Sequence, residues 1–265
     1  SFRKNPCYHR VSSLLHYIDS NKRFYCDSQC ELVIRVGDRL LNKIIGLLNR
    51  CYDSIYIDEF QDFRLSEYEF LSSVCSKLDS VTLVGDFYQH SVVPLKNFGA
   101  PYENKKIPIT YDEFKSNLEM QGFVVDEATL RLSRRCSPNI CEFIRTKLNI
   151  KIYSDGRNSG VIRGVADNEI ESLLKNERVW KLVWNDAKVR RFSPCVNWSY
   201  SKGDTYPTTC IILTGKDKAA PCILDDGFDA SNLSVTTRNT LYVALTRSSG
   251  DVYIITPRQA REYNL

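Results

Sequence analysis

The sequence of 265 residues has few methionines and histidines and lacks a long apolar run. It has one methionine, Met120, and it begins with Ser1, so we expect it to be a piece of a longer chain. No apolar stretch approaches the ~20 residues that a membrane-spanning helix requires. We recognise no signal peptide before the cysteines. We therefore expect no contact with a membrane and a cytoplasmic location.

The charge is nearly balanced, with 36 basic and 32 acidic residues and a formal net charge of +4. This balance permits a polyanionic partner without requiring one. The apolar share of 43% is ample for packed cores. The ten cysteines are scattered, several of them inside apolar runs, and we interpret them as reduced and mostly buried thiols. Cys7, His9, Cys26 and Cys30 are an alternative metal site, although their spacing matches no usual pattern.

An acidic strand end is the feature around which the chain is organised. The apolar residues before Asp58 predict a buried strand, and Asp58, Glu59 and Asp62 follow it directly. Ligands of open α/β sheets bind at the carboxyl ends of parallel strands. Asp58 is therefore suited to hold Mg²⁺, and Glu59 is suited to orient and deprotonate a water. The alternative is that Asp58 or Asp62 simply caps the next helix.

A second polar strand end follows along the chain. Residues 65–78 have a helical pattern, and the apolar residues 81–84 then run into Gly85, Asp86 and, three positions on, Gln89. Strand, helix and strand in this order are typical of a parallel sheet. The sequence therefore predicts an α/β fold in which both acidic ends lie at one edge of a sheet.

The rest of the sequence alternates in the same way. We expect further helices over residues 11–18, 39–48, 111–120, 138–148 and 238–245. We expect further strands over residues 127–132, 179–184, 196–202, 209–213 and 252–255. A boundary near Val125 would divide the chain into domains of residues 1–125 and 126–265.

Five segments, taken in order, resemble the motifs of UvrD/Rep-type helicases of superfamily 1. The segment from Ile57 to Asp62 is similar to motif II, and Val84 to Gln89 is similar to motif III. Residues 132–140, residues 200–205 and residues 241–247 are similar to motifs IV, V and VI. The resemblance spans residues 55–256, which is most of the chain.

The resemblance implies two RecA-like domains of the P-loop NTPase type, with ATP and Mg²⁺ between them and single-stranded DNA across them. It implies that Asp58 and Glu59 bind Mg²⁺ and that Glu59 activates water. Gln61 and Gln89 would lie near the γ-phosphate. It also implies that Arg135 and Arg247 contact the phosphates. Gly203 and Thr205 would lie near the ribose and phosphates. Arginine suits such a role because its guanidinium binds phosphate oxygens in pairs.

Simpler interpretations exist for each arginine. Arg247 follows an expected helix, where a cation satisfies carbonyl groups and the helix dipole. Arg135 has Glu142 and Asp86 as candidate ion-pair partners. We prefer the phosphate-binding interpretation because the five segments occur together and in order.

The chain also departs from the family pattern. It has no Gly-x-x-x-x-Gly-Lys-[Ser/Thr] loop, so the first RecA-like domain is expected to be truncated at its N-terminus, and this chain alone should bind ATP poorly and not hydrolyse it. Thr205 stands where many members have glutamate. Phe98, Tyr102 and Trp198 are our candidates for stacking on bases, with burial in a core as the alternative.

We therefore expect part of an ATP-dependent DNA helicase or translocase, of the kind used in DNA repair. Lys202 lies only 67 positions after Arg135, which leaves no room for a large insertion and indicates a compact motor. The family suggests DNA and 3′-to-5′ movement by analogy. The alternatives are a non-enzymatic module that binds nucleic acid or a partner protein, and a subunit of a nuclease–helicase complex.

Overall fold

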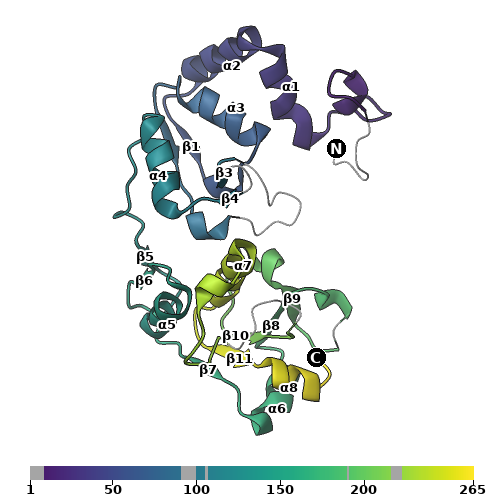
Figure 1. Ribbon diagram of the computed structural model, residues 1–265, viewed down its shortest axis with the longest axis vertical. Coiled ribbons are helices and arrows are strands. Elements are labelled where there is room, and N and C mark those ends of the chain that lie inside the picture. Colours follow the sequence, from purple (N-terminus) through teal and green to yellow (C-terminus); the bar gives the residue numbers. More distant parts are fainter. Residues whose placement is uncertain (1–8, 91–99, 105–106, 190, 216–222) are drawn as a thin grey trace. The chain divides into compact units, whose positions relative to one another are not determined.

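The computed structural model describes residues 9–90, 100–104, 107–189, 191–215 and 223–265 (Figure 1). Contacts between residues divide the chain into two units. The first contains the described residues up to Phe87 and those from 100 to Val125. The second contains residues 88–90 and the described residues from Asp126 to Leu265. No helix in these ranges is both long and apolar enough to cross a bilayer.

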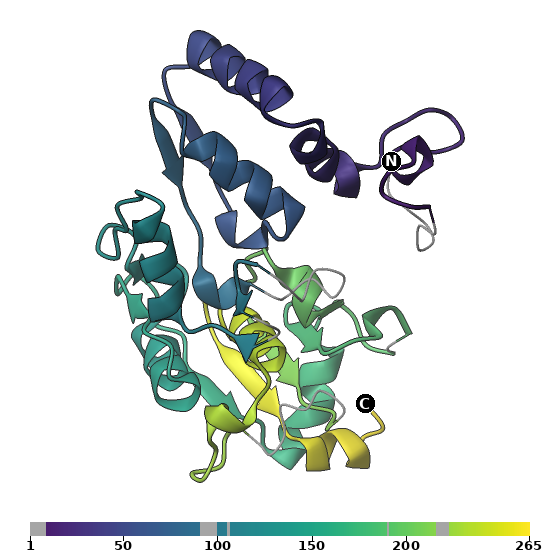
Figure 2. The ribbon, with the colours of Figure 1, turned by 45° about the horizontal axis from the view of Figure 1, so that its top comes forward.

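The first unit contains two short parallel strands, β1 (Ile55–Ile57) and β2 (Val81–Leu83), which pair along their whole length. Helix α3 (Ser66–Cys75) connects the two strands and lies beside them (Figures 1 and 2). Its other elements are α1 (Gln29–Val36), α2 (Asp38–Cys51), the antiparallel pair β3 (Glu103–Asn104) and β4 (Ile107–Pro108), and α4 (Tyr111–Met120). Leu41 and Ile45 of α2 pack with Val74 of α3 in a small core.

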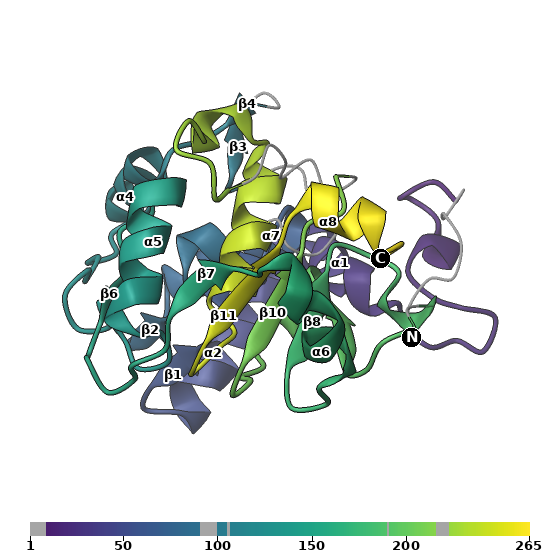
Figure 3. The same ribbon diagram turned by 90° about the horizontal axis from the view of Figure 1, so that it is seen from below.

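The second unit is built on a five-stranded parallel sheet. Its strand order is β7 (Ile162–Gly164), β11 (Val252–Ile255), β10 (Thr209–Ile212), β8 (Trp180–Val183) and β9 (Cys195–Asn197). Figure 3 shows the first four of these strands in this order. All four strand pairings are parallel. A further parallel pair, β5 (Leu132–Ser133) and β6 (Tyr153–Ser154), stands apart from this sheet.

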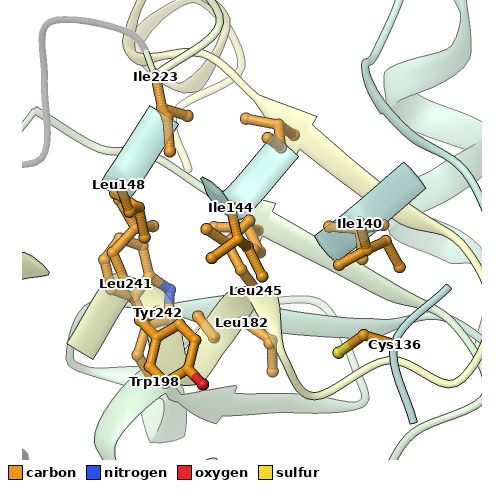
Figure 4. Packing of buried hydrophobic residues seen from close by; sticks show 14 of the residues in the cluster. Cys136, Ile140, Ile144, Leu148, Leu182, Trp198, Ile223, Leu241, Tyr242 and Leu245 are labelled. Carbon is orange, nitrogen blue, oxygen red and sulfur yellow. The ribbon is translucent and has the colours of Figure 1, made fainter. Parts of the chain in front are cut away.

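Helices cover both faces of this sheet. They are α5 (Pro138–Leu148), α6 (Ile170–Lys175), α7 (Val235–Leu245) and α8 (Pro257–Glu262). Ile211 and Ile254 share a core with α5 and α7, whereas the neighbouring strand residues Ile212 and Ile255 share a core with α6 and α8. Alternate strand side chains point to opposite faces, so the sheet is the middle of three layers. Figure 4 shows the larger of these cores.

The predicted fold class, α/β with parallel sheets, is confirmed by these strand pairings. The helices predicted over residues 111–120 and 138–148 are confirmed at both ends. The second of them begins as its sequence indicates, because Ser137 accepts a hydrogen bond from the Ile140 N–H and Pro138 occupies the first position.

Three predicted elements are wrong in extent. Residues 11–18 contain only a 3-10 turn at Leu14–His16, since Asp19 accepts hydrogen bonds from the N–H groups of Asn21 and Arg23 and closes a turn instead. The strand expected over 127–132 begins only at residue 132, in β5, because Asp126 accepts from two N–H groups and forms a turn before it. The strand expected over 196–202 ends at residue 197 and continues as the 3-10 helix Trp198–Ser201.

Candidate functional site

The first unit brings the two acidic strand ends together. Ile57 of β1 lies opposite Leu83 of β2, so Asp58 and Glu59 leave one strand where Asp86 leaves the other. Two backbone hydrogen bonds continue the pairing beyond the strands. The Val84 N–H donates to the Ile57 carbonyl at 2.8 Å, and the Phe60 N–H donates to the Val84 carbonyl at 2.9 Å.

Gln61 connects the two strand ends. Its side chain is buried, with 2% of the residue exposed. The amide nitrogen donates to the Glu59 carboxylate, and the amide oxygen accepts from the Asp86 N–H at 3.0 Å. One buried amide thus positions the carboxylate of one motif and the backbone of the other.

Gly85 makes room for this amide. A Cβ atom at position 85 would lie 2.5 Å from the amide oxygen of Gln61 and 3.3 Å from its backbone nitrogen. Real Cβ atoms essentially never approach a neighbour at 2.5 Å. A larger residue at this strand end would therefore force the Gln61 amide to move, and glycine is favoured here by close packing rather than by an unusual backbone angle.

Asp58 and Glu59 are exposed, and the backbone of Glu59 is left-handed, with φ 53° and ψ 38°. The Asp58 carboxylate accepts from the Glu59 N–H at 2.8 Å. A left-handed backbone costs a non-glycine residue about 1 kcal/mol or more and is enriched at functional sites. Both acidic residues are thus exposed at this turn.

The carboxylates fit Mg²⁺ in their chemistry. Mg²⁺ prefers oxygen ligands and is usually held by one or two carboxylates with several waters. Within the described ranges, no group of three or more His, Cys, Asp or Glu side chains is arranged to hold a metal ion. Asp58 and Glu59 are oxygen donors of the class that Mg²⁺ prefers.

The alternative capping role of these acids is not found. The N-cap residue of α3 is Leu65, which makes no side-chain capping bond. Neither Asp58 nor Asp62 occupies this position.

The second unit brings Arg135 and Arg247 together at Thr246. Arg135 Nη1 donates to the Thr246 carbonyl at 3.1 Å, and Arg247 Nη2 donates to the Thr246 hydroxyl at 3.0 Å. Arg247 is 2% exposed, and its Nε also donates to the Val243 carbonyl at 2.9 Å. The helix-end role considered for Arg247 is therefore present. The ion pair considered between Arg135 and Glu142 is not formed.

The loop with Gly203 and Thr205 lies beside this arginine pair. Gly203 has a φ of 88°, a conformation that glycine adopts without strain. The Tyr206 N–H donates to the Arg247 carbonyl at 2.8 Å, and the Tyr206 hydroxyl donates to Asp204 at 2.8 Å. Thr205 is exposed. The segments that resemble motifs IV, V and VI thus converge within one unit.

The segment after Asp86 connects to the helix that ends at Arg247. Residues 88–90 belong to the second unit, together with α7. The Asn239 side-chain amide of α7 donates to the His90 carbonyl at 2.9 Å. Arg238 lies over the Tyr88 ring at 5.5 Å, and the Tyr88 and Tyr242 rings meet at 6.3 Å. Gln89, half-buried between these anchors, is part of this segment.

Two of the three aromatic residues expected to stack on bases are buried, which corrects that expectation. Tyr102 is 1% exposed and stacks on Phe114 at 5.2 Å between ring centroids, and Trp198 is 0% exposed and packs edge-on against Trp184. Figure 4 shows Trp198 inside the core. A ring must be accessible to stack on a base, so these two side chains serve packing. Phe98 lies outside the described residues.

Sequence reasoning assigned no role to Thr246 or Asn239, although both lie within or near a motif. Thr246 accepts hydrogen bonds from both arginines, and Asn239 anchors His90. Thr246 could have been found from the sequence because it follows directly after the expected helix and directly precedes Arg247. For Asn239 the signal is a polar residue in the middle of an apolar helix, where it is fully buried.

The cysteines within the described ranges are free thiols. Cys26 and Cys30 are not part of any metal-binding group there, and Cys7 lies outside those ranges. Burial raises the pKa of the Cys75 thiol to about 11, which keeps it protonated near neutral pH.

No family model and no curated protein matches this chain. Among solved structures, it is similar to the helicase nonstructural protein 10 of an arterivirus, with 17% identity, a TM-score of 0.47, and coverage of 79% of this chain and 41% of that chain. The same protein in complex with DNA has 17% identity and a TM-score of 0.47, with coverage of 79% of this chain and 42% of that chain. A PRRSV helicase has 17% identity and a TM-score of 0.43, with coverage of 80% of this chain and 36% of that chain. The chain thus spans about two fifths of the length of the chains that it matches.

Proposed function

We propose that this chain is part of an ATP-dependent helicase or translocase of superfamily 1, which acts on single-stranded nucleic acid. The observation that carries the proposal is the link made by Gln61 between Glu59 and the Asp86 N–H. It joins two motif-like segments through a buried amide at the carboxyl ends of parallel strands. This is the edge at which open α/β sheets bind nucleotides.

The acidic strand end supplies the chemistry of phosphoryl transfer. In the proposed reaction, Glu59 orients an attacking water and accepts its proton, while Gln61 keeps the Glu59 carboxylate in place. Asp58 and Glu59 would hold Mg²⁺, which neutralises charge on the phosphate oxygens when it is bound. Positioning and charge stabilisation account for most of the catalysis of such reactions.

The arginine pair supplies positive charge for the phosphates. Within the described residues Arg135 uses only Nη1, on the Thr246 carbonyl, so its Nε and Nη2 make no hydrogen bond there. A guanidinium held at one nitrogen and open at the others is prepared for an anion. Arg247 is held through Nε and Nη2, and in the proposal it supports and extends this charge.

The nucleotide, the direction of movement, the cellular role and the assembly are also proposals. We propose that ATP is the nucleotide, with Gly203 and Thr205 near its ribose and phosphates and Gln89 near its γ-phosphate. We also propose a UvrD/Rep-type mechanism on DNA in the 3′-to-5′ direction, a role in DNA repair, and action within a larger assembly such as one with a nuclease. The five ordered segments of the sequence support these features.

A second candidate is a module that binds nucleic acid or a protein without hydrolysing ATP. The observation in its favour is that the 265 residues contain no Gly-x-x-x-x-Gly-Lys-[Ser/Thr] loop. That loop normally surrounds the β- and γ-phosphates. The two candidates differ in whether a longer protein that contains this chain hydrolyses ATP.

The test is the steady-state ATPase rate of the full-length protein, with and without single-stranded DNA or RNA, beside this chain alone. Glu59→Gln should lower the stimulated rate by about 10²–10⁴-fold, the usual contribution of a general base. Glu119→Gln, an exposed acid on α4, is the matched control and should keep the rate. A full-length protein without ATPase activity would support the binding module instead.

A further inference from the structure

A cluster of basic side chains surrounds Tyr153 in the second unit. The guanidinium carbon of Arg131 lies 4.2 Å from the centroid of the Tyr153 ring, and that of Arg145 lies 4.9 Å from it. Lys151 precedes this tyrosine by two residues and is exposed. We call Arg131, Arg145, Lys151 and Tyr153 the basic cluster.

The fold builds this cluster from three places in the chain. Leu132 of β5 pairs with Tyr153 of β6, which places Arg131 at the start of one strand beside the first residue of the other. Arg145 comes from the last turn of α5, and its Nη1 donates to the Ile152 carbonyl at 2.6 Å. The guanidinium groups are thus held by a ring and a carbonyl rather than left free to rotate.

The cluster lacks a counter-charge. Arg131, Arg145 and Lys151 form no ion pair with a carboxylate anywhere in the described ranges. The pKa of the Tyr153 phenol lies below its ordinary value because of a hydrogen bond from Arg131, the charge of Arg131, and the charges of Arg145 and Lys151. The phenol therefore reports a local excess of positive charge.

A second arginine–tyrosine pair in the same unit shows what a neutralised site looks like. Arg163 lies over the Tyr253 ring at 4.9 Å, which is similar to the spacing in the basic cluster. It also forms a two-point ion pair with Glu169, at 2.8 and 2.9 Å. The basic cluster has the same cation–ring contact without the carboxylate.

We propose that the basic cluster is a phosphate-binding subsite for a single strand of nucleic acid. This inference rests on the proposed function and specifies where the strand is held. Uncompensated cations repel each other, and a polyanion relieves that repulsion while it releases its own counterions. The two guanidinium groups offer paired donors that match the oxygens of successive phosphates.

The basic cluster should contact the phosphates of the nucleic acid and not its bases. The Tyr153 ring is already in contact with the guanidinium groups of Arg131 and Arg145, so it does not stack on a base. The strand is instead held by the positive charges. Phosphate contacts position a strand without reading its sequence. Homopolymers of different bases should therefore bind it alike.

The test is the binding of fluorescent 20-nucleotide single strands, DNA and RNA separately, to this chain at a series of KCl concentrations. Each phosphate contact contributes about 0.7 to the slope of log affinity against log salt for single strands. The double variant Arg131→Gln and Lys151→Gln should lower the magnitude of this slope by about 1.4, with a loss of affinity at low salt. Its thermal unfolding should stay close to that of the parent, because both residues are exposed and only the contact of Arg131 with the Tyr153 ring is lost.

The matched control is the double variant Arg163→Gln and Lys175→Gln, whose side chains are paired with Glu169 and Glu171. It removes the same charge and should leave the salt slope unchanged. An equal decrease of the salt slope in both double variants would show a general attraction between the positive charge of the chain and the nucleic acid, and it would overturn the subsite. A parent chain that binds neither DNA nor RNA would also overturn the subsite, whereas the ATPase rate of the full-length protein decides the proposed function.

The phenol gives a second readout. The ultraviolet absorbance of phenolate, taken as the difference between the parent chain and Tyr153→Phe, follows the titration of Tyr153. A bound strand brings phosphate charge to the cluster, so it should raise the pKa of Tyr153 towards its ordinary value. A Tyr153 titration that is the same with and without the strand contradicts the proposal.

Discussion

Arg135 donates a hydrogen bond from Nη1 to the carbonyl oxygen of Thr246 at 3.1 Å, across 111 residues of sequence. The hydroxyl of the same threonine accepts from Arg247 at 3.0 Å and donates back to the Tyr242 carbonyl at 3.0 Å. Thr246 is 4% exposed. One buried threonine at the end of α7 therefore fixes the spacing between the two arginines that we propose act on the phosphates.

Thr246→Val should destabilise the second unit by about 1–3 kcal/mol, because Nη2 of the buried, charged Arg247 loses the hydroxyl that accepts from it. The matched control is Thr240→Val in the same helix, which is equally buried but loses only a neutral hydrogen bond to the Thr236 carbonyl. The control should cost about 1 kcal/mol or less. Urea unfolding of both variants measures the difference. Equal costs would mean that Thr246 does not hold Arg247.

Gly85→Ala should destabilise the first unit by about 1–3 kcal/mol, because the new Cβ displaces the buried amide of Gln61. Gly46→Ala is the control, since a Cβ there meets nothing within 4 Å and position 46 lies within α2. It should stabilise the chain by about 0.5–1 kcal/mol. Thermal unfolding gives both values, and faster hydrogen exchange of the Asp86 N–H in the Gly85 variant would show that Gln61 has moved. Unchanged exchange would contradict this account of the glycine.

Asn239→Leu should release residues 88–90 from α7, because the variant cannot donate to the His90 carbonyl. Hydrogen exchange followed by mass spectrometry should show loss of protection in the peptide that contains these residues. Asn139→Leu, at an exposed position on α5, is the control and should leave that peptide protected. The anchoring role fails if the two variants exchange alike.

Acid should weaken the chain partly through Glu169. The pKa of this carboxyl is lowered from 4.5 to about 2 by its hydrogen bonds from Arg163 and from the Ala166 N–H. Because the folded pKa is depressed, its contribution to stability is fully present above pH 4.5 and is lost as the pH falls towards 2. Glu169→Gln should therefore show a smaller fall in melting temperature between pH 5 and pH 2 than the parent, because most of this range lies between the unfolded pKa of 4.5 and the folded pKa of about 2. Glu142→Gln, which removes an exposed acid on α5, should follow the parent.

Local patterns predicted the elements on which the candidate site stands. The apolar residues 55–57 and 81–83 form strands because β-branched and aromatic side chains suit a pleated, half-buried surface, and the acids after them fall at strand ends. Ser137 and Pro138 predicted the start of α5, since capping depends only on neighbouring residues. Trp198 shows the limit of such patterns, because an aromatic residue suits a core and a binding surface equally well.

The sequence by itself determined where β1 and β2 lie, where α5 begins, and which acids and arginines are available, because these properties depend on residues a few positions apart. Tertiary structure decided the rest. It joined Glu59 to Asp86 through Gln61, Arg135 to Thr246, and Arg131 to Tyr153. It also buried Tyr102 and Trp198. Each of these outcomes depends on the pairing of strands and the packing of helices that are distant in sequence, and no local pattern records which distant group a side chain will meet.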